Sequence, residues 1–360
     1  MGNQYEGRQI IAGVKKAATW GTAVALGAGN GILLSSESLG AKAPTFVDDP
    51  ALGQSQIREM IQTQESMAGG LDGLFRWGSA WEVLLALALG TVSTPTQKST
   101  TSAYAAVYTP KDNNDGAFAT VALKKSATTH NIWEVPTAKV SGFTISGEMG
   151  GKVKVSVNLA GNKIETQSAV NTGATMANVT YSPTVLQDNI ADFGTGTYVR
   201  VNTASSSALT SAHNIYPQNF ELSFTRPTDH PRFQPGSINA AEPLQDGPIQ
   251  VKLKLGFDKY DSDTYVDAIV GKTHKKVEIG IVGPAISAYT YKLGILLPSV
   301  FFTQADSPVG DMGLIPHTVD AVGLRPDTVS SGMTSAGCGI NLLDSLGLYV
   351  TNKRTTSPIA

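Results

Sequence analysis

The chain has 360 residues, which is enough for one large β domain or for two smaller domains. Its 27 Lys and Arg residues nearly balance its 29 Asp and Glu residues, which excludes a broad basic surface for nucleic acid and an acidic tail. The single cysteine, Cys338, excludes an intrachain disulfide and a cysteine zinc cluster.

The first 70 residues show little periodicity. The opening residues, MGNQYEGRQ, lack the plan of a signal peptide, and the most apolar run, 81–90, is far too short to span a bilayer. We therefore expect folding in the cytoplasm without a membrane anchor.

Residues 1–35 are small and Gly-rich and predict an irregular arm that leads into a strand. Residues 36–70 are polar, and QSQIREMIQ at 54–62 predicts a short helix.

A core helix is predicted at 78–89. Large and small apolar residues recur there at the spacing of one helical face, at Trp77, Trp81, Leu84, Leu85 and Ala88. Gly90 follows in the position where glycine commonly ends a helix. We expect this helix to pack on a sheet.

From residue 100 onward the pattern is that of β-strands. Short runs bounded by turn residues predict strands at 103–110, 118–125, 197–202, 276–283 and 289–298, and a last strand at LGLYVTN, 346–352. A short helix is predicted at 263–271.

Two strand pairs resemble each other. The stretch 142–159, GFTISGEMGGKVKVSVNL, alternates apolar and polar residues on both sides of a Gly-rich turn. GFTIS (142–146) matches NFELS (219–223), and VKVSVNL (153–159) matches VKLKLGF (251–257). Chance similarity and internal pseudo-symmetry are both open interpretations of this match.

The second pair is joined by a long loop, 225–248, which contains five prolines. Proline stiffens a loop and cannot donate a hydrogen bond to a sheet. We interpret the loop as a contact arm and expect that deleting 230–245 leaves a folded subunit that no longer assembles. The candidate contact residues are Pro227, His230, Arg232, Pro235 and Pro243.

The polar faces of the two ribbons carry Lys152, Lys154, Lys252 and Lys254. They are either ordinary solvent-facing residues of amphipathic strands or a basic surface for a polyanion. We favour the first interpretation.

No motif indicates catalysis, a cofactor or a metal. The glycine string GAGNG (27–31) is followed by a β-like segment, whereas a dinucleotide site needs a strand before it and a helix after it. DKYDSD (258–263) lacks the spacing of an EF-hand loop, so a turn with a helix N-cap at Asp261 or Asp263 is favoured over a weak cation site. The histidines are scattered, at His130, His213, His230, His274 and His317. We expect no enzymatic activity.

Taken in chain order, four segments resemble the major tail tube proteins of long-tailed bacteriophages. They are KKAATWGTAVA (15–25), the helix that ends in ALALG (86–90), the ribbon 139–161, and the series FELSFTRP, long loop, QVKLKLGFDKYDSDTYVDAIVG and LGILLPSVFF. The likeness spans most of residues 10–320, and the segments 160–215 and 320–360 match less well.

The resemblance implies a mainly β fold, a β-sandwich or barrel-like domain with a flanking helix and long assembly arms. It divides the chain into an N-terminal arm and polar segment (1–70), the tail tube domain (71–320) and a C-terminal extension (321–360). It implies a structural virion protein whose hexameric rings stack into a hollow conduit for genome delivery. The implied partners are further copies of the chain, a tape measure protein, a tail terminator, and distal tail or baseplate proteins.

DNA is expected to pass through such a tube without specific binding. Because each Lys–phosphate contact adds affinity, we expect the four ribbon lysines to be paired with acids or to point away from the channel. Alternatives are another tail or injection-machine component, such as a tail-completion ring or a contractile-system tube, or a capsid decoration protein. An alternative of a different class is a glycan-binding or hydrolytic β module on the virion surface.

Overall fold

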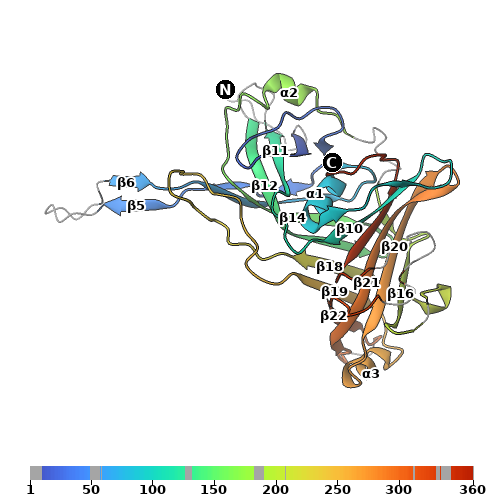
Figure 1. Ribbon diagram of the computed structural model, residues 1–360. Helices are drawn as coiled ribbons and strands as arrows, with labels where there is room; N and C mark the ends of the chain where they lie inside the picture. Colours follow the sequence, from blue (N-terminus) through green and yellow to red (C-terminus); the bar gives the residue numbers. More distant parts are fainter. Residues whose placement is uncertain are drawn as a thin grey trace.

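The computed structural model is mainly β (Figure 1). It describes residues 10–48, 57, 59–125, 132–181, 190–206, 208–310, 313–329, 333 and 342–359. Cys338 and His130 lie outside these residues. A large antiparallel sheet curls around a buried helix, and a thin two-stranded arm extends from the body on one side.

Six antiparallel strands form the centre of the sheet. Their order is β7 (Ser66–Leu74), β14 (Lys154–Gly161), β12 (Ile132–Glu148), β18 (Asn219–Thr225), β19 (Gln250–Phe257) and β22 (His317–Gly323). Strands β18, β19 and β22 and the start of β14 alternate between a buried and a more exposed face, because successive side chains of a strand point to opposite sides. This central sheet therefore has one apolar face and one polar face.

Two long strands carry the sheet beyond this centre. The first half of β12 pairs with β11 (Phe118–Lys124), which is followed by β1 (Ile11–Lys16) and β2 (Gly31–Ile32). The second half of β21 (Tyr289–Asp306) pairs with β22. The first half of β21 lies between two further groups of strands. On one side, in order, are β20 (Lys275–Ile286), β16 (Tyr198–Thr203) and β17 (Asn214–Ile215). On the other side are β23 (Gly347–Asn352) and β10 (Tyr104–Pro110), and β10 also pairs with β8 (Gly90–Val92) and β9 (Thr96–Gln97).

The remaining elements are short. β3 (Ser36–Glu37) and β4 (Gly40–Lys42) pair with β7, and β13 (Gly151–Lys152) pairs with β15 (Asp192–Phe193). The outer part of the arm is β5 (Thr45–Asp48) paired with β6 (Glu59–Gln62). The helices are α1 (Ala80–Leu89), α2 (Gly173–Ala177), α3 (Thr264–Val270) and a 3-10 turn at Ser211–His213.

Helix α1 forms the middle of the core. Ser79 caps its start, and Gly90 ends it with a left-handed φ of 89°, a conformation that glycine adopts without strain. All ten of its residues are buried, as expected of a helix whose residues are all apolar except Glu82. It packs against β12, β1 and β10, and Trp81 lies so close to Gly73 of β7 that an added Cβ there would be 2.6 Å from the indole.

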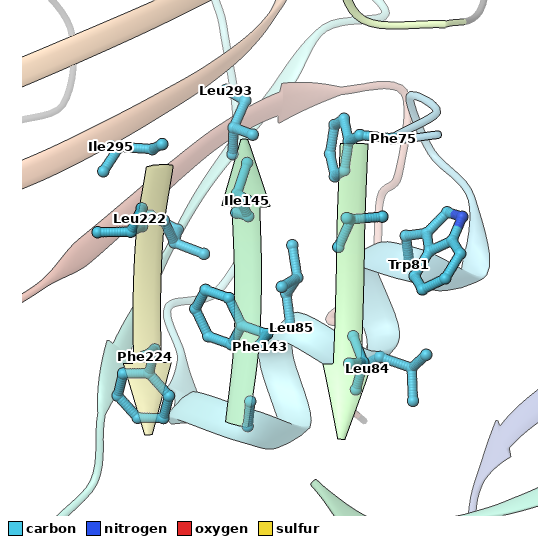
Figure 2. Close-up of a cluster of buried hydrophobic side chains, with 14 of the residues drawn as sticks. Phe75, Trp81, Leu84, Leu85, Phe143, Ile145, Leu222, Phe224, Leu293 and Ile295 are labelled. Carbon is cyan, nitrogen blue, oxygen red and sulfur yellow. The ribbon is translucent and has the colours of Figure 1, made fainter. Parts of the chain in front are cut away.

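Figure 2 shows how α1 meets the central sheet. Phe143 of β12 lies beside Leu85 of the helix, whereas Ile145 of β12 and Leu222 of β18 lie toward Leu293 and Ile295 of β21. Phe143 stacks on Phe224 of β18 with ring centroids 5.1 Å apart. Burial of each such side chain contributes about 1.5–3 kcal/mol to folding. The packing of these apolar side chains fixes the position of the strands, whose opposite face is polar.

The central sheet has a local pseudo-two-fold symmetry. Ile145 pairs with Leu222, and these two residues are equivalent in the sequence match between 142–146 and 219–223. On the outer strands Val155 lies opposite Ile145 and Leu253 lies opposite Leu222, again at matched positions. The pseudo-symmetry interpretation of the two ribbons is thus supported by their register.

The strands and helices predicted from residue 78 onward are present, including α3 with Asp263 as its N-cap and the last strand β23. The helix predicted at 54–62 is wrong in its described final part, because Glu59–Gln62 is the strand β6, paired with β5. The N-terminal segment also differs from an irregular arm, since Ile11–Lys16 pairs along its length with β11. The division at residues 70 and 320 stays a prediction, although β7 and β22 continue across those positions.

Candidate assembly surfaces

The polar face of the central sheet carries three of the four predicted lysines. Lys154, Lys252 and Lys254 are exposed and project from β14 and β19 on the side away from α1. Lys252 and Lys254 line an open depression over β18, β19, β21 and β22, together with Glu221, Asp320 and others. This face is continuous across the six strands, because their registers bring polar residues into transverse rows.

Lys152 stands apart from this row. It belongs to the small β13–β15 pair beyond the turn of the first ribbon, and its Nζ lies 2.6 Å from a carboxylate oxygen of Asp192. Both side chains are about half exposed, so the pair contributes little to stability.

The loop 225–248 is anchored on its own subunit. Lys139 of β12 is 1% exposed, and its ammonium lies 3.1 Å from Glu242 Oε1 and donates to the Pro243 carbonyl at 2.9 Å. Arg232 donates twice to the Glu242 carbonyl. The loop therefore supplies two partners of a buried charge, whose third is Asp115 at 3.5 Å. The proline pattern did not reveal this structural role.

Two further anchors hold the ends of this loop. Arg226 is buried, donates to the Leu89 carbonyl at the end of α1, and has its pKa lowered to about 10 by burial. The His230 imidazole donates from Nε2 to the Met67 carbonyl at 2.9 Å. Burial lowers the pKa of His230, and the Met67 hydrogen bond and the charge of Asp229 oppose this effect.

The prolines of the loop differ in environment. Pro243 is buried beside Lys139, Pro227 is half-buried against Gly247, and Pro235 is exposed. Of the five predicted contact residues, only Pro235 lies fully on the surface of the subunit.

The arm formed by β5 and β6 has apolar side chains on both faces. Phe46 lies opposite Ile61, with 58% and 47% of their surfaces exposed, and Met60, which is 61% exposed, lies opposite Val47. Because neighbours along a strand alternate, these two pairs occupy opposite faces. An isolated two-stranded hairpin is marginally stable in water, so the arm needs cover from another surface.

Exposed large hydrophobic side chains of the described residues gather at the two ends of the central strands. At the end that carries the arm they are Phe46, Ile57, Met60, Ile61, Ile238 and Leu244. At the opposite end, where β12 turns and α3 lies, they are Met149, Tyr216, Val266, Val270, Val309 and Leu314. Only three other such side chains appear in the described parts, Val170, Val329 and Leu343. Apolar patches at two opposite ends are typical of a chain that associates end to end.

The described residues contain no group of three or more His, Cys, Asp or Glu side chains that could hold a metal ion. Within the same residues, no helix has the length and hydropathy needed to cross a membrane. The acidic stretch 258–263 precedes α3, and Asp263 stands at the N-cap position, as favoured from the sequence, but its side chain makes no capping hydrogen bond.

A family model described as phage tail tube protein matches residues 7–323. The chain belongs to this phage tail tube protein family. Among curated protein sequences, no relative matches it. This tail tube protein is thus a structural subunit of the phage tail, and the family assigns it to the virion and to self-assembly into a tube with other tail proteins.

Several residues important to the tail tube protein's surfaces were missed from the sequence. Lys139 sits in the run AKVSGF, and its partner Glu242 lies 103 residues further along the chain. The apolar residues of the arm were visible in TFVD and EMIQ, two short strand-like segments close together in the sequence. These two segments could have predicted a β-hairpin, and the prediction of a helix at 54–62 was made instead.

Proposed function

We propose that six copies of this tail tube protein form a ring, and that stacked rings form the hollow conduit through which the phage genome is delivered. The observation that supports this most is the central six-stranded sheet. Its apolar face lies in the core with α1 and the apolar residues of β21, and its polar face is open across the six strands. In the proposed ring these polar faces point inward and line a water-filled channel.

End-to-end stacking is supported by the two apolar ends. A contact between different surfaces of identical subunits repeats without limit along an axis, which produces a filament. The arm, with apolar residues on both faces, is covered on each face when it lies between copies of the neighbouring ring. The tape measure protein occupies the channel during assembly, and a terminator and distal tail proteins close the two ends of the tube. Assembly takes place in the cytoplasm of the host.

Electron microscopy of the purified protein tests this proposal. We expect hollow tubes of stacked rings. Replacing residues 45–62 by a short Gly-Ser linker should leave a folded subunit that stays monomeric or forms single rings, because β5 and β6 pair only with each other in the described structure.

A matched pair of point variants separates the arm from general surface effects. Phe46→Ser with Ile61→Ser should abolish tubes, whereas Val170→Ser with Val329→Ser, at exposed residues outside the two ends, should not. Tubes of normal length from the linker variant would exclude the arm from stacking, and a wild-type protein that never polymerises, even with other tail proteins, would refute the proposed function.

A further inference from the structure

A buried lysine lies in contact with two carboxylates that come from different parts of the chain. The Lys139 side chain on β12 is 2% exposed, and its Nζ lies 3.1 Å from Glu242 Oε1 and 3.5 Å from Asp115 Oδ1. Asp115 belongs to the turn between β10 and β11, and Glu242 belongs to the loop 225–248. Formation of an amide between side chains requires an amine, a carboxyl group and a nearby group that carries protons. All three are present here.

Glu242 is held where it can move protons between the other two side chains. Its Oε1 contacts Lys139 Nζ and also accepts a hydrogen bond at 2.8 Å from the backbone amide of Gly116, the residue that follows Asp115. Arg232 fixes the backbone of this residue by donating twice to the Glu242 carbonyl. The Glu242 carboxylate therefore touches the amine and is anchored to the backbone next to the second carboxyl group.

The amine side of this cluster is shielded from water. Phe118 lies directly opposite Lys139 in the register of β11 and β12, and its ring packs edge-on against Trp20 with ring centroids 5.3 Å apart. The Asp115 side chain, in contrast, is 47% exposed, so a water molecule released there has a path to solvent. Burial of an ion pair carries a desolvation cost, and conversion of the pair into a neutral amide removes both charges. Desolvation of Lys139 thus favours the amide.

We propose that Lys139 and Asp115 become joined by an isopeptide bond, with Glu242 as the proton carrier. Nζ forms a bond to Cγ of Asp115, and one C–O bond of that carboxyl group breaks. Glu242 takes two protons in turn from Nζ and passes both to the departing oxygen, which leaves as water. An ammonium and a carboxylate thereby become one amide and one water molecule, without an oxidant, a reductant or a cofactor.

The geometry is close to the one that the reaction needs. Reacting atoms in a productive arrangement lie about 3–3.5 Å apart, and a rotation of the half-exposed Asp115 side chain brings its Cγ to Nζ. The bond would fix the β10–β11 turn to β12 beneath the loop 225–248. Cross-links between distant residues stabilise a fold mainly by restricting the unfolded chain. An amide persists in a denaturing solvent and an ion pair does not, so the unfolded protein distinguishes the two.

Intact-mass spectrometry of the denatured full-length protein tests this inference. We expect the wild-type mass to be lower than the sequence mass by one water molecule, once the presence or absence of Met1 is allowed for. We also expect a tryptic digest to contain a branched peptide that joins residues 112–124 to the peptide around Lys139, uncut at that lysine. Wild-type protein at the full sequence mass, without the branched peptide, would overturn the inference.

Three variants should restore the full mass, and one should not. Lys139→Met and Asp115→Ala remove the two reacting groups, and Glu242→Gln removes the proton carrier with little change in size. Glu165→Gln is the matched control, because it neutralises a carboxylate that pairs with Lys163 away from the cluster, and it should keep the loss of water. A branched peptide that persists in Glu242→Gln would overturn the role of Glu242.

The branched peptide and Lys139→Met also exclude a different product. An Asp–Gly sequence such as Asp115–Gly116 loses water when a succinimide ring closes within the chain, and that product needs no lysine. A loss of water that survives Lys139→Met would therefore overturn the inference. The wild-type mass is decisive even where a variant does not fold. The measurement does not depend on assembly, so a failure to form tubes would count only against the proposed function.

Discussion

At the scale of single residues, Glu82 joins the core helix to the C-terminal segment. It is fully buried on α1, where its carboxylate accepts hydrogen bonds from the Gly78 amide and from Asn352 Nδ2, both at 2.7 Å, and lies 3.7 Å from Arg354 Nε. Desolvation raises the pKa of Glu82, and the charge of Arg354 and the hydrogen bonds act against this. The segment 342–359 is therefore tied to the centre of the subunit.

Replacement of Glu82 by alanine should destabilise the subunit by about 2–4 kcal/mol, because buried donors of Gly78 and Asn352 lose their acceptor. Urea unfolding followed by circular dichroism measures this. Glu165→Ala is the control, since the Glu165 side chain is 39% exposed and its ion pair with Lys163 is long, at 3.6 Å. Equal stability of both variants would show that the buried carboxylate does not tie the two segments together.

The histidine of the loop predicts a pH dependence of stability. Burial lowers the pKa of His230 in the folded state below its ordinary value of 6.5, so the unfolded chain binds the proton more readily. The contribution of neutral His230 is complete above pH 6.5 and is lost as the pH falls through the folded-state pKa. Urea midpoints at pH 7.5 and pH 5.5 should differ less in His230→Gln than in wild type. An unchanged difference would contradict this assignment.

At the scale of elements, the loop 225–248 acts as a strap on the body of the subunit. Its Glu242 and Pro243 satisfy the buried Lys139, and its backbone pairs with the base of the arm, where Glu65 exchanges hydrogen bonds with residues 238 and 240. The loop thus links β12, α1 and the arm, and its geometry argues against a freely projecting contact arm.

Deletion of residues 230–245 should therefore destabilise folding as well as assembly, in contrast to the expectation from the sequence. Removal of one partner from a buried ion pair costs about 3–5 kcal/mol. A thermal melt should show a lower Tm. The further change Lys139→Met should recover part of the loss, because it removes a buried charge whose remaining carboxylate partner is Asp115, at 3.5 Å. A deletion variant that melts with wild-type Tm would restore the interpretation of the loop as an independent contact arm.

The elements that the sequence predicted share a local signal. Alternation at 142–159 and 251–257 follows from one face lying on the core, and the helix at 78–89 is recognisable from its spacing and from Gly90. The strand at Glu59–Gln62 was not recognised, because its β conformation depends on pairing with β5, which precedes it by more than ten residues in the chain.

The charge environment of the candidate surface residues depends on neighbours that are far away in the sequence. Lys252 and Lys254 were identifiable on an amphipathic strand, but Asp320 is 66 residues from Lys254 and becomes its neighbour only when β22 pairs with β19. The partners of Lys139 and Glu82 are likewise distant in sequence. Single-residue candidates could be found from the sequence, whereas their charge environment required the sheet register.

At the scale of the whole molecule, the subunit is polar on one sheet face and apolar at two ends. The pseudo-two-fold symmetry relates the strands of the central sheet but not the segments attached to them. The short ribbon turn and α3 lie at one end, and the long loop and the arm lie at the other. Unlike ends favour a polar filament, in which every subunit points the same way along the axis.

Electron cryomicroscopy of the assembled tube tests the central claim most directly, because one reconstruction shows which surface faces the channel and what covers the arm. We predict six subunits in each ring, with the polar face that carries Lys154, Lys252 and Lys254 around the channel. We also predict that Phe46 and Met60 of the arm are buried against the neighbouring ring. A tube whose channel is lined by another surface of the subunit, with the arm exposed to solvent, would contradict this account.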